Sequence, residues 1–200
     1  MILLNVIGQG LNTLDRLTLV ERDRDAWQHA PEIISQLDVR NGSRVVDLGC
    51  GAGYFALKLA AAVGATGTVQ AVDILRLPLA FLWIRAARQS AHNLHVVLGE
   101  TDDPRISAPV DAVLVANTYH ELSRPGIVLG HLRSALVAGG RLVIADRCPQ
   151  PSDAGHAIAP LLVETELRRD GFEIVSRNDH FLDQPGEGPW WLIVARKASL

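Results

Sequence analysis

The chain has 200 residues, of which 48% are hydrophobic and 20% charged, and its formal net charge at pH 7 is −3. These proportions are typical of a globular protein and exclude an intrinsically disordered one. The net negative charge argues against a nucleic-acid partner, because a protein that neutralises phosphates needs a basic surface. Two cysteines, Cys50 and Cys148, are too few for a disulfide framework or a four-thiolate metal site.

The N-terminal residues 1–10 are apolar, but they lack the basic start and the small-residue cleavage site of a signal peptide. The longest apolar stretches are interrupted well before the length of a membrane span. We therefore expect a cytoplasmic protein without a membrane partner, whose cysteines are free thiols in a reducing compartment.

Short β-branched runs alternate with segments of helical spacing along the chain. After a helical lead-in over residues 1–40, the spacing predicts helices over residues 54–63, 77–91, 127–137 and 159–169. Strands are predicted over residues 43–48, 68–72, 94–98, 112–116, 142–145, 172–176 and 190–195. This alternation predicts parallel βαβ units, and hence one three-layer α/β domain over residues 41–200. No helix separates the last two strands, so we expect them to pair as an antiparallel hairpin at one edge.

The loop after the first strand has glycines at positions 49, 51 and 53. Ligands of open α/β sheets bind beyond the carboxyl ends of the strands, and alternating glycines let the backbone approach such a ligand closely. The helix that follows points its amides at the same place. The dinucleotide pattern G-x-G-x-x-G would require a glycine at Tyr54, so the spacing argues against a nicotinamide enzyme.

Asp47, at the end of the same strand, indicates the kind of ligand. A carboxylate that faces the loop repels a pyrophosphate but suits a ligand that has an ammonium group and no phosphate. S-adenosylmethionine is such a ligand, because it carries an amino acid at one end and adenosine at the other.

Asp73 closes the second strand, 20 residues after Gly53. An acidic side chain at this spacing is placed to accept hydrogen bonds from both ribose hydroxyls of an adenosine. The alternative is that Asp73 only caps the turn that follows it.

The lead-in residues 23–29 (DRDAWQH) resemble those of a subgroup of small bacterial members among the class I S-adenosylmethionine-dependent methyltransferases. Six stretches in this order resemble motifs of the class as a whole. They are VVDLGCGAGYFALKLA, AVDI, VVLGETDDP, DAVLVANTYHEL, LVAGGRLVIAD, and GFEIV with WWLIVARK. The resemblance covers nearly the whole chain. It implies a Rossmann-like sheet of seven strands in the order 3-2-1-4-5-7-6 with strand 7 antiparallel. It also implies S-adenosylmethionine as cofactor and S-adenosylhomocysteine as product.

The resemblance further assigns cofactor-binding roles by position. The loop after the first strand would hold the methionine end, the end of the second strand the ribose, and the acidic loop after the third the adenine. That acidic loop is alternatively no more than a solvated segment. The lead-in would cover the cofactor, with a tryptophan over the sulfonium or, alternatively, packed between helix and sheet. The residues concerned are Trp27, Asp47, Gly49, Cys50, Gly51, Asp73, Ile74, Glu100, Thr101, Asp102 and Asn117.

Methyl transfer from a sulfonium is an in-line displacement, so the protein mainly has to align the reacting atoms in a dry pocket. A base is needed only where the acceptor must first lose a proton, and His120 is the best candidate for one. The alternative role of His120 is to orient a loop. Asp146, after the fifth strand, either contacts the acceptor or caps a turn. No set of residues has the spacing of metal ligands, so we expect no metal.

The acceptor itself is not identified by the sequence, and oxygen, nitrogen, carbon and sulfur acceptors all stay open. A large recognition domain is absent from the pattern, which favours a small molecule. Two rival functions remain: a protein that binds S-adenosylmethionine without turnover, and a nicotinamide-dependent oxidoreductase. The apolar stretch 79–84 fits either a homodimer surface or a helix buried against the sheet.

Overall fold

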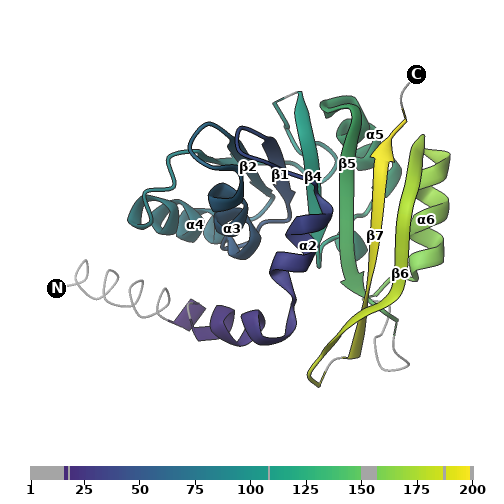
Figure 1. Cartoon of the computed structure of the whole chain (residues 1–200), viewed down its shortest axis with the longest axis horizontal. Helices are drawn as coiled ribbons and strands as arrows, with labels where there is room; N and C mark the ends of the chain where they lie inside the picture. Colours follow the sequence, from purple (N-terminus) through teal and green to yellow (C-terminus); the bar gives the residue numbers. More distant parts are fainter. Residues whose placement is uncertain (1–15, 18, 108, 150–156, 187, 199–200) are drawn as a thin grey trace.

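The centre of the fold is a seven-stranded sheet with the strand order β3-β2-β1-β4-β5-β7-β6 (Figure 1). The computed structural model describes residues 16–17, 19–107, 109–149, 157–186 and 188–198, so residues 1–15 of the expected lead-in lie outside it. β1 to β5 pair in parallel, whereas β7 is antiparallel to β5 and β6. The expected order and the antiparallel seventh strand are confirmed. The strands are β1 (Arg44–Leu48), β2 (Thr68–Asp73), β3 (Leu94–Leu98), β4 (Val110–Ala116), β5 (Leu136–Arg147), β6 (Phe172–Gln184) and β7 (Gly188–Lys197).

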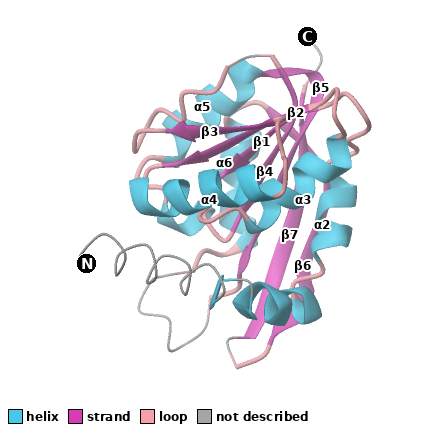
Figure 2. Cartoon of the chain, turned by 90° about the vertical axis from the view of Figure 1, so that its left-hand side faces the viewer, coloured by secondary structure: helices cyan, strands magenta, loops and turns pink. Residues whose placement is uncertain are grey.

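Helices cover both faces of the sheet. α2, α3 and α4 contribute to the hydrophobic core on one face, and α5 and α6 contribute to the core on the other. Figure 2 shows the twist of the sheet between these layers, with β3 lying almost across the direction of β7. Residues 19–27 form a further helical segment ahead of α2. The helices are α2 (Ala30–Gln36), α3 (Tyr54–Val63), α4 (Arg76–Arg88), the short 3-10 helix η1 (Tyr119–Glu121), α5 (Pro125–Ala135) and α6 (Pro160–Arg169).

The apolar runs of the central strands are explained by burial on both faces. Val45 and Val46 in β1 are fully buried, and β4 is buried at every position except Asp111. Parallel strands that are covered by helices are apolar at consecutive positions, not only at alternate ones. α3 packs against them through side chains spaced four residues apart, such as Phe55 and Leu59.

β5 begins at Leu136 and not at residue 142 as expected, because Gly139 and Gly140 lie in a bulge inside the strand. Val110 of β4 pairs with Leu136, and Ala112 pairs next with Arg141, so the intervening residues of β5 are looped out of register. Gly139 has a φ of 71° in this bulge, a conformation that glycine adopts easily.

β6 is also longer than expected and continues to Gln184. It pairs with β7 across two register shifts, and together they extend past the ends of the neighbouring strands (Figure 1). Most of its side chains from Glu173 to His180 are exposed. An exposed polar strand has no alternating apolar pattern, so its length is set by its pairing with β7.

The apolar stretch 79–84 in α4 has two faces. Leu79 and Leu82 are buried against the sheet, as one of the two interpretations expected, whereas Trp83 and Ile84 are exposed. In the part of the chain that the structure describes, no helix is both long and apolar enough to span a membrane.

The residues of interest converge at one edge of the sheet because the parallel strands all end there. β1 lies between β2 and β4, which makes it the point where the strand order reverses and where such sheets bind ligands. Asp73 ends β2, and Gly49 and Asn117 directly follow β1 and β4. The helical segment over residues 19–27 crosses the same edge (Figure 1).

Candidate functional site

Among the cavities at this carboxyl edge, two are lined by both Gly49 and Asn117. The first, of about 310 Å³, is bounded by the ends of β1 and β2 and by the loop after β3, and we name it the acidic-loop cavity. The second, of about 270 Å³, lies between the glycine loop and the lead-in helix, and we name it the lead-in cavity. Because they share two residues, the two cavities together form one elongated site.

The space around the two loop glycines, Gly49 and Gly51, differs. A Cβ at Gly49 would overlap the Thr118 side chain, so this glycine allows the loops after β1 and β4 to touch. A Cβ at Gly51 would meet nothing within 4 Å, although Gly51 lines the lead-in cavity. Both have φ in the left-handed region, 75° and 52°. The space beside Gly51 is therefore open to a ligand.

Asp47 is the least satisfied polar group of the site. It is 2% exposed, lines the lead-in cavity, and its Oδ2 has no hydrogen-bond partner among the described residues. Burial raises the pKa of this carboxyl to about 7, although the Arg24 guanidinium and a hydrogen bond from the Ala56 backbone N–H act in the opposite direction. A buried acceptor without a partner costs free energy, and an N–H donor on a ligand would offset that cost. The position fits an ammonium group.

Arg24, on the lead-in helix, lines the same cavity. Its guanidinium lies 4.0 Å from the centre of the Tyr54 ring, and its Nε donates to Gln28 Oε1 at 2.6 Å. Burial lowers the pKa of this guanidinium, which nevertheless stays charged at neutral pH. The structure records no ion pair between Arg24 and Asp47 within the residues it describes. One cavity thus presents a cation and an anion, which is the complement of a zwitterionic amino acid.

Asp73 accepts hydrogen bonds from the backbone of two loops and also lines the acidic-loop cavity. Its Oδ2 accepts a hydrogen bond from the Gly51 N–H and its Oδ1 accepts one from the Leu75 N–H, both at 2.9 Å. The capping role is therefore present in the structure. Each carboxylate oxygen accepts more than one hydrogen bond, so capping leaves room for the hydroxyls of a ribose.

The acidic loop after β3 borders the acidic-loop cavity and a neighbouring cavity of about 590 Å³, and its residues 100–102 all line the neighbouring one. Glu100 and Thr101 line the acidic-loop cavity together with Ile74. Asp102 does not line it and instead pairs with Arg124, at the start of α5. Of the three acidic-loop residues predicted to border the adenine, two are at the acidic-loop cavity.

Trp27 and Cys50 lie at different depths of the lead-in region. Trp27 packs edge-on against Trp190 of β7 at 5.6 Å between ring centres and lines neither cavity. This contact corresponds to the packing alternative and not to a cover over the sulfonium. Cys50 is buried and lines the lead-in cavity, and burial raises the pKa of its thiol.

The loop after β4 is held in a strained conformation. Asn117 has a φ of 55°, and its N–H donates to the Ala145 carbonyl at 2.8 Å. Left-handed backbone is uncommon for residues other than glycine and concentrates at functional sites. Tyr119 anchors the same loop, since its hydroxyl donates to Glu166 Oε2 of α6 at 2.7 Å.

His120 and Asp146 form a buried pair behind this loop. His120 Nδ1 lies 2.8 Å from Asp146 Oδ1 and 3.0 Å from Oδ2, and Asp146 is fully buried. The carboxylate raises the pKa of the imidazole above its usual value, against the effect of burial. Asp146 therefore orients His120 and caps the loop at once, because it also accepts the His120 backbone N–H at 3.2 Å. The other ring nitrogen, Nε2, is 3.8 Å from Glu121 Oε1.

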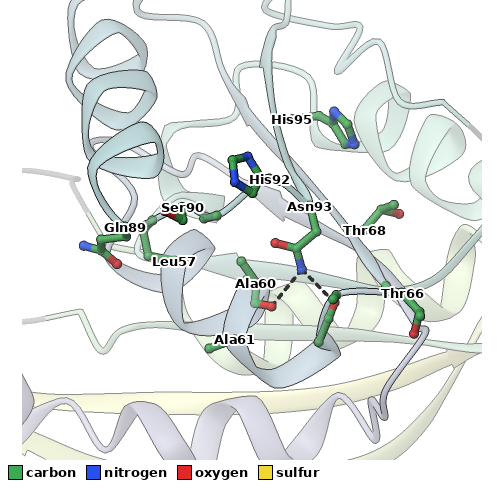
Figure 3. Close-up of a pocket in the computed structure, with 14 residues that line it drawn as sticks. Leu57, Ala60, Ala61, Thr66, Thr68, Gln89, Ser90, His92, Asn93 and His95 are labelled. Carbon is green, nitrogen blue, oxygen red and sulfur yellow. Dashed lines mark hydrogen bonds between the residues drawn. The ribbon is translucent and has the colours of Figure 1, made fainter.

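A further cavity, of about 570 Å³, lies at the opposite edge of the sheet near the ends of α3 and α4 (Figure 3). Asn93 there donates to the carbonyls of Ala60 and Gly64, both at 2.8 Å. Its lining residues include no carboxylate, and none of the predicted site residues. In the described part of the chain, no group of three or more His, Cys, Asp or Glu side chains is arranged to hold a metal ion.

Residues 39–180 match the family described as "Methyltransferase domain". The chain belongs to this family. An S-adenosylmethionine-dependent methyltransferase from Aquifex aeolicus has the same fold, with a TM-score of 0.74 at 21% identity, over 92% of this chain and 97% of that one. S-adenosylmethionine is accordingly the cofactor of the family, and the residues of the two cavities fit it.

Two further proteins show the range of this methyltransferase fold. Nocamycin O-methyltransferase of Saccharothrix syringae is 29% identical over 136 residues, which are 67% of this chain and 48% of that protein. The chain spans about half the length of the curated relatives it matches. The [4+2]-cyclase SpnF has a TM-score of 0.74 at 15% identity, over 86% of this chain and 81% of that one. The fold alone therefore does not establish methyl transfer.

Sequence reasoning did not find Arg24. The residue lies in the lead-in, 23 positions before Asp47, and no local pattern links the two. The resemblance included Arg24 in the segment expected over the cofactor, but it gave this residue no role of its own.

The raised pKa of Asp47 predicts a pH-dependent stability of the cofactor-free protein. From pH 4 to pH 7 the folded chain keeps a proton on Asp47 that the unfolded chain has released, so stability falls as pH rises through this window. Asp47→Asn removes the buried charge, and should raise the free energy of unfolding at pH 8 by on the order of 1 to 4 kcal/mol. Urea unfolding at pH 4 and pH 8 measures the difference, which should vanish at pH 4. Equal free energies of unfolding for the wild type and Asp47→Asn at pH 4 and at pH 8 would contradict the raised pKa of Asp47.

The two glycines provide a matched pair of substitutions. Gly49→Ala should lower stability by about 2 kcal/mol or more, because its methyl group overlaps Thr118. Gly51→Ala should cost only about 1 kcal/mol of backbone strain. It should nevertheless weaken S-adenosylhomocysteine binding at least about tenfold, as its methyl group enters the space of the ligand. Denaturant unfolding and calorimetric titration separate the two effects. A Gly51→Ala protein with unchanged affinity would show that no ligand passes this position.

Proposed function

We propose that the chain transfers the methyl group of S-adenosylmethionine to a small-molecule acceptor. The observation that carries this proposal is the buried Asp47 carboxylate, whose Oδ2 lacks a partner among the described residues while Arg24 lines the same cavity. A cavity with one anion and one cation complements the ammonium and carboxylate of a methionine moiety. A dinucleotide would instead place pyrophosphate beside Asp47, where like charges repel.

The two cavities divide the cofactor between them in this proposal. Asp47 and Arg24 would bind the amino acid in the lead-in cavity, while Asp73 would bind the ribose in the acidic-loop cavity. Glu100 and Thr101 would border the adenine, with Ile74 against its face. Gly49 and Asn117, which line both cavities, would lie beside the sulfur. Residues 19–40 of the lead-in would form the cover over this site, and residues 41–200 the cofactor-binding domain.

The chemistry requires alignment and, for some acceptors, removal of a proton. The bound cofactor supplies an electrophilic methyl group on a positively charged sulfur. The acceptor atom forms a bond to the methyl carbon as the carbon–sulfur bond breaks, and the electron pair of that bond goes to the sulfur. His120 would take the acceptor proton at Nε2, while Asp146 holds Nδ1 and stabilises the imidazolium. Asn117 and the glycine loop would exclude water from the reacting atoms.

The proposed base narrows the acceptor class. An acceptor that uses His120 carries a hydroxyl or another X–H group that loses its proton on methylation. The relative from Saccharothrix syringae is named as an O-methyltransferase, which supports oxygen as the first acceptor class to test. Small molecules with phenolic or enolic hydroxyls are therefore the first compounds to screen for release of S-adenosylhomocysteine.

Calorimetric titration with S-adenosylmethionine, S-adenosylhomocysteine and NADH tests the cofactor assignment. We expect the first two to bind at micromolar concentrations and NADH not to bind. Asp73→Ala should weaken binding about ten- to a hundredfold, because a charged hydrogen-bond partner of the ribose is lost. Asp111→Ala, a carboxylate at the amino ends of the strands, serves as control and should leave affinity unchanged. Binding of NADH alone would overturn the proposal.

His120→Gln tests the base once an acceptor has been found. We expect kcat to fall about a hundredfold to ten-thousandfold with unchanged affinity for S-adenosylhomocysteine, because proton removal is lost and cofactor binding is not. Asp146→Asn should lower kcat in the same direction. If His120→Gln turns over as fast as the wild type, the histidine only orients the loop.

A further inference from the structure

Arg85, on α4, is a buried charged side chain that joins two walls of the lead-in cavity. It is 8% exposed, although arginine is rarely buried without a specific partner. Its Nη1 donates to Glu21 Oε1 at 2.7 Å and also to the Ala52 carbonyl, and its Nη2 pairs with Glu21 Oε2. Glu21 belongs to the lead-in helix and Ala52 to the glycine loop, so one guanidinium holds both segments.

The Glu21–Arg85 ion pair is important for the geometry that it fixes more than for the free energy that it contributes to folding. A buried ion pair is often no better for stability than apolar side chains of the same volume, because both charges lose their hydration. What a bidentate arginine does supply is a fixed geometry. Here that geometry sets the distance between the lead-in helix and the loop that carries Gly51.

The Glu21–Arg85 ion pair, which we name the clamp, also fixes the position of Arg24, the cation that lines the lead-in cavity. Glu21 precedes Arg24 by three residues, which is close to one helical turn, and both line the lead-in cavity. A second set of contacts holds the same helix from a more exposed side, where Asp25 accepts from the Tyr54 hydroxyl at 2.8 Å and pairs with Lys58 at 2.9 Å. The Glu21 side chain is 19% exposed and that of Asp25 is 49% exposed, so solvent screens the second set more strongly.

We propose that Glu21 and Arg85 are positioning residues that close the lead-in helix over the amino-acid end of the cofactor. This inference rests on the proposed function, since it assumes that the lead-in cavity receives a methionine moiety. The clamp sets how strongly the chain prefers an adenosine ligand with an amino acid over one without. Neither Glu21 nor Arg85 lines the acidic-loop cavity, so the adenosine end is independent of the clamp.

Two ligands that differ only at the amino-acid end test this inference. S-adenosylhomocysteine has the full amino acid, whereas 5′-methylthioadenosine has the same adenosine and sulfur with a methyl group in its place. Glu21→Gln should weaken S-adenosylhomocysteine about ten- to a hundredfold and change 5′-methylthioadenosine less than about twofold. Arg85→Lys keeps the positive charge but loses the bidentate geometry. It should change the ratio of the affinities for S-adenosylhomocysteine and 5′-methylthioadenosine in the same direction, by a smaller factor.

Asp25→Asn is the matched control, because it makes the same acid-to-amide change one turn later on the same helix. It should change the ratio of the two affinities less than about threefold. Thermal melting without ligand shows whether each variant folds. The proposal is wrong if Glu21→Gln and Arg85→Lys weaken the affinities for both ligands equally. It is also wrong if neither variant changes either affinity. If the wild type binds neither ligand, the proposed function itself fails, which is a different outcome from a clamp that fails.

Discussion

The arrangement of the site depends on Asp47, a carboxylate buried near the carboxyl ends of the parallel strands. One of its oxygens has no hydrogen-bond partner among the described residues. Asp47 is the fourth of the five residues of β1, and its neighbours Val45, Val46 and Leu48 are apolar and buried, so the sheet that stabilises the fold also removes water from this acid. Burial raises its pKa to about 7, which places the group between its two protonation states under ordinary conditions. The folded chain bears this cost before any ligand binds, as is common where function and stability compete. A cationic ligand group is the partner that would remove it.

The rest of the site is organised around this acid by segments far apart in the sequence. The glycine loop gives access to it, Arg24 adds the opposite charge from the lead-in helix, and Arg85 ties that helix to the loop from α4. The loop after β4, with the left-handed Asn117, joins this charged end to the cavity beside Asp73. In the proposed function, the lead-in helix, the glycine loop and α4 would therefore act together in ligand binding, because the Arg85 side chain contacts both of the other segments.

The sequence predicted what local pattern and spacing determine. Consecutive apolar residues gave the buried strands, and their alternation with helices, together with the family resemblance, gave the sheet order. Asp47 and Asp73 could be singled out as candidates because each lies at or next to the last residue of its strand. The residues missed were those whose roles depend on distant contacts, because Arg24 and Arg85 look like ordinary helix charges. For Trp27 the sequence left two alternatives open, and its contact with Trp190 corresponds to packing between helix and sheet. The full length of β6 also escaped prediction, since exposed polar strands carry no alternating pattern.

The central claim is that a cofactor ammonium group binds the ionised Asp47. Calorimetric titration with S-adenosylhomocysteine at pH 6, in two buffers of different ionisation enthalpy, counts the protons released on binding. The wild type should release about one proton for each ligand bound, because Asp47 must ionise to pair with the ammonium, and Asp47→Asn should release none. Binding by the wild type without proton release, or the same release from both proteins, would contradict the account.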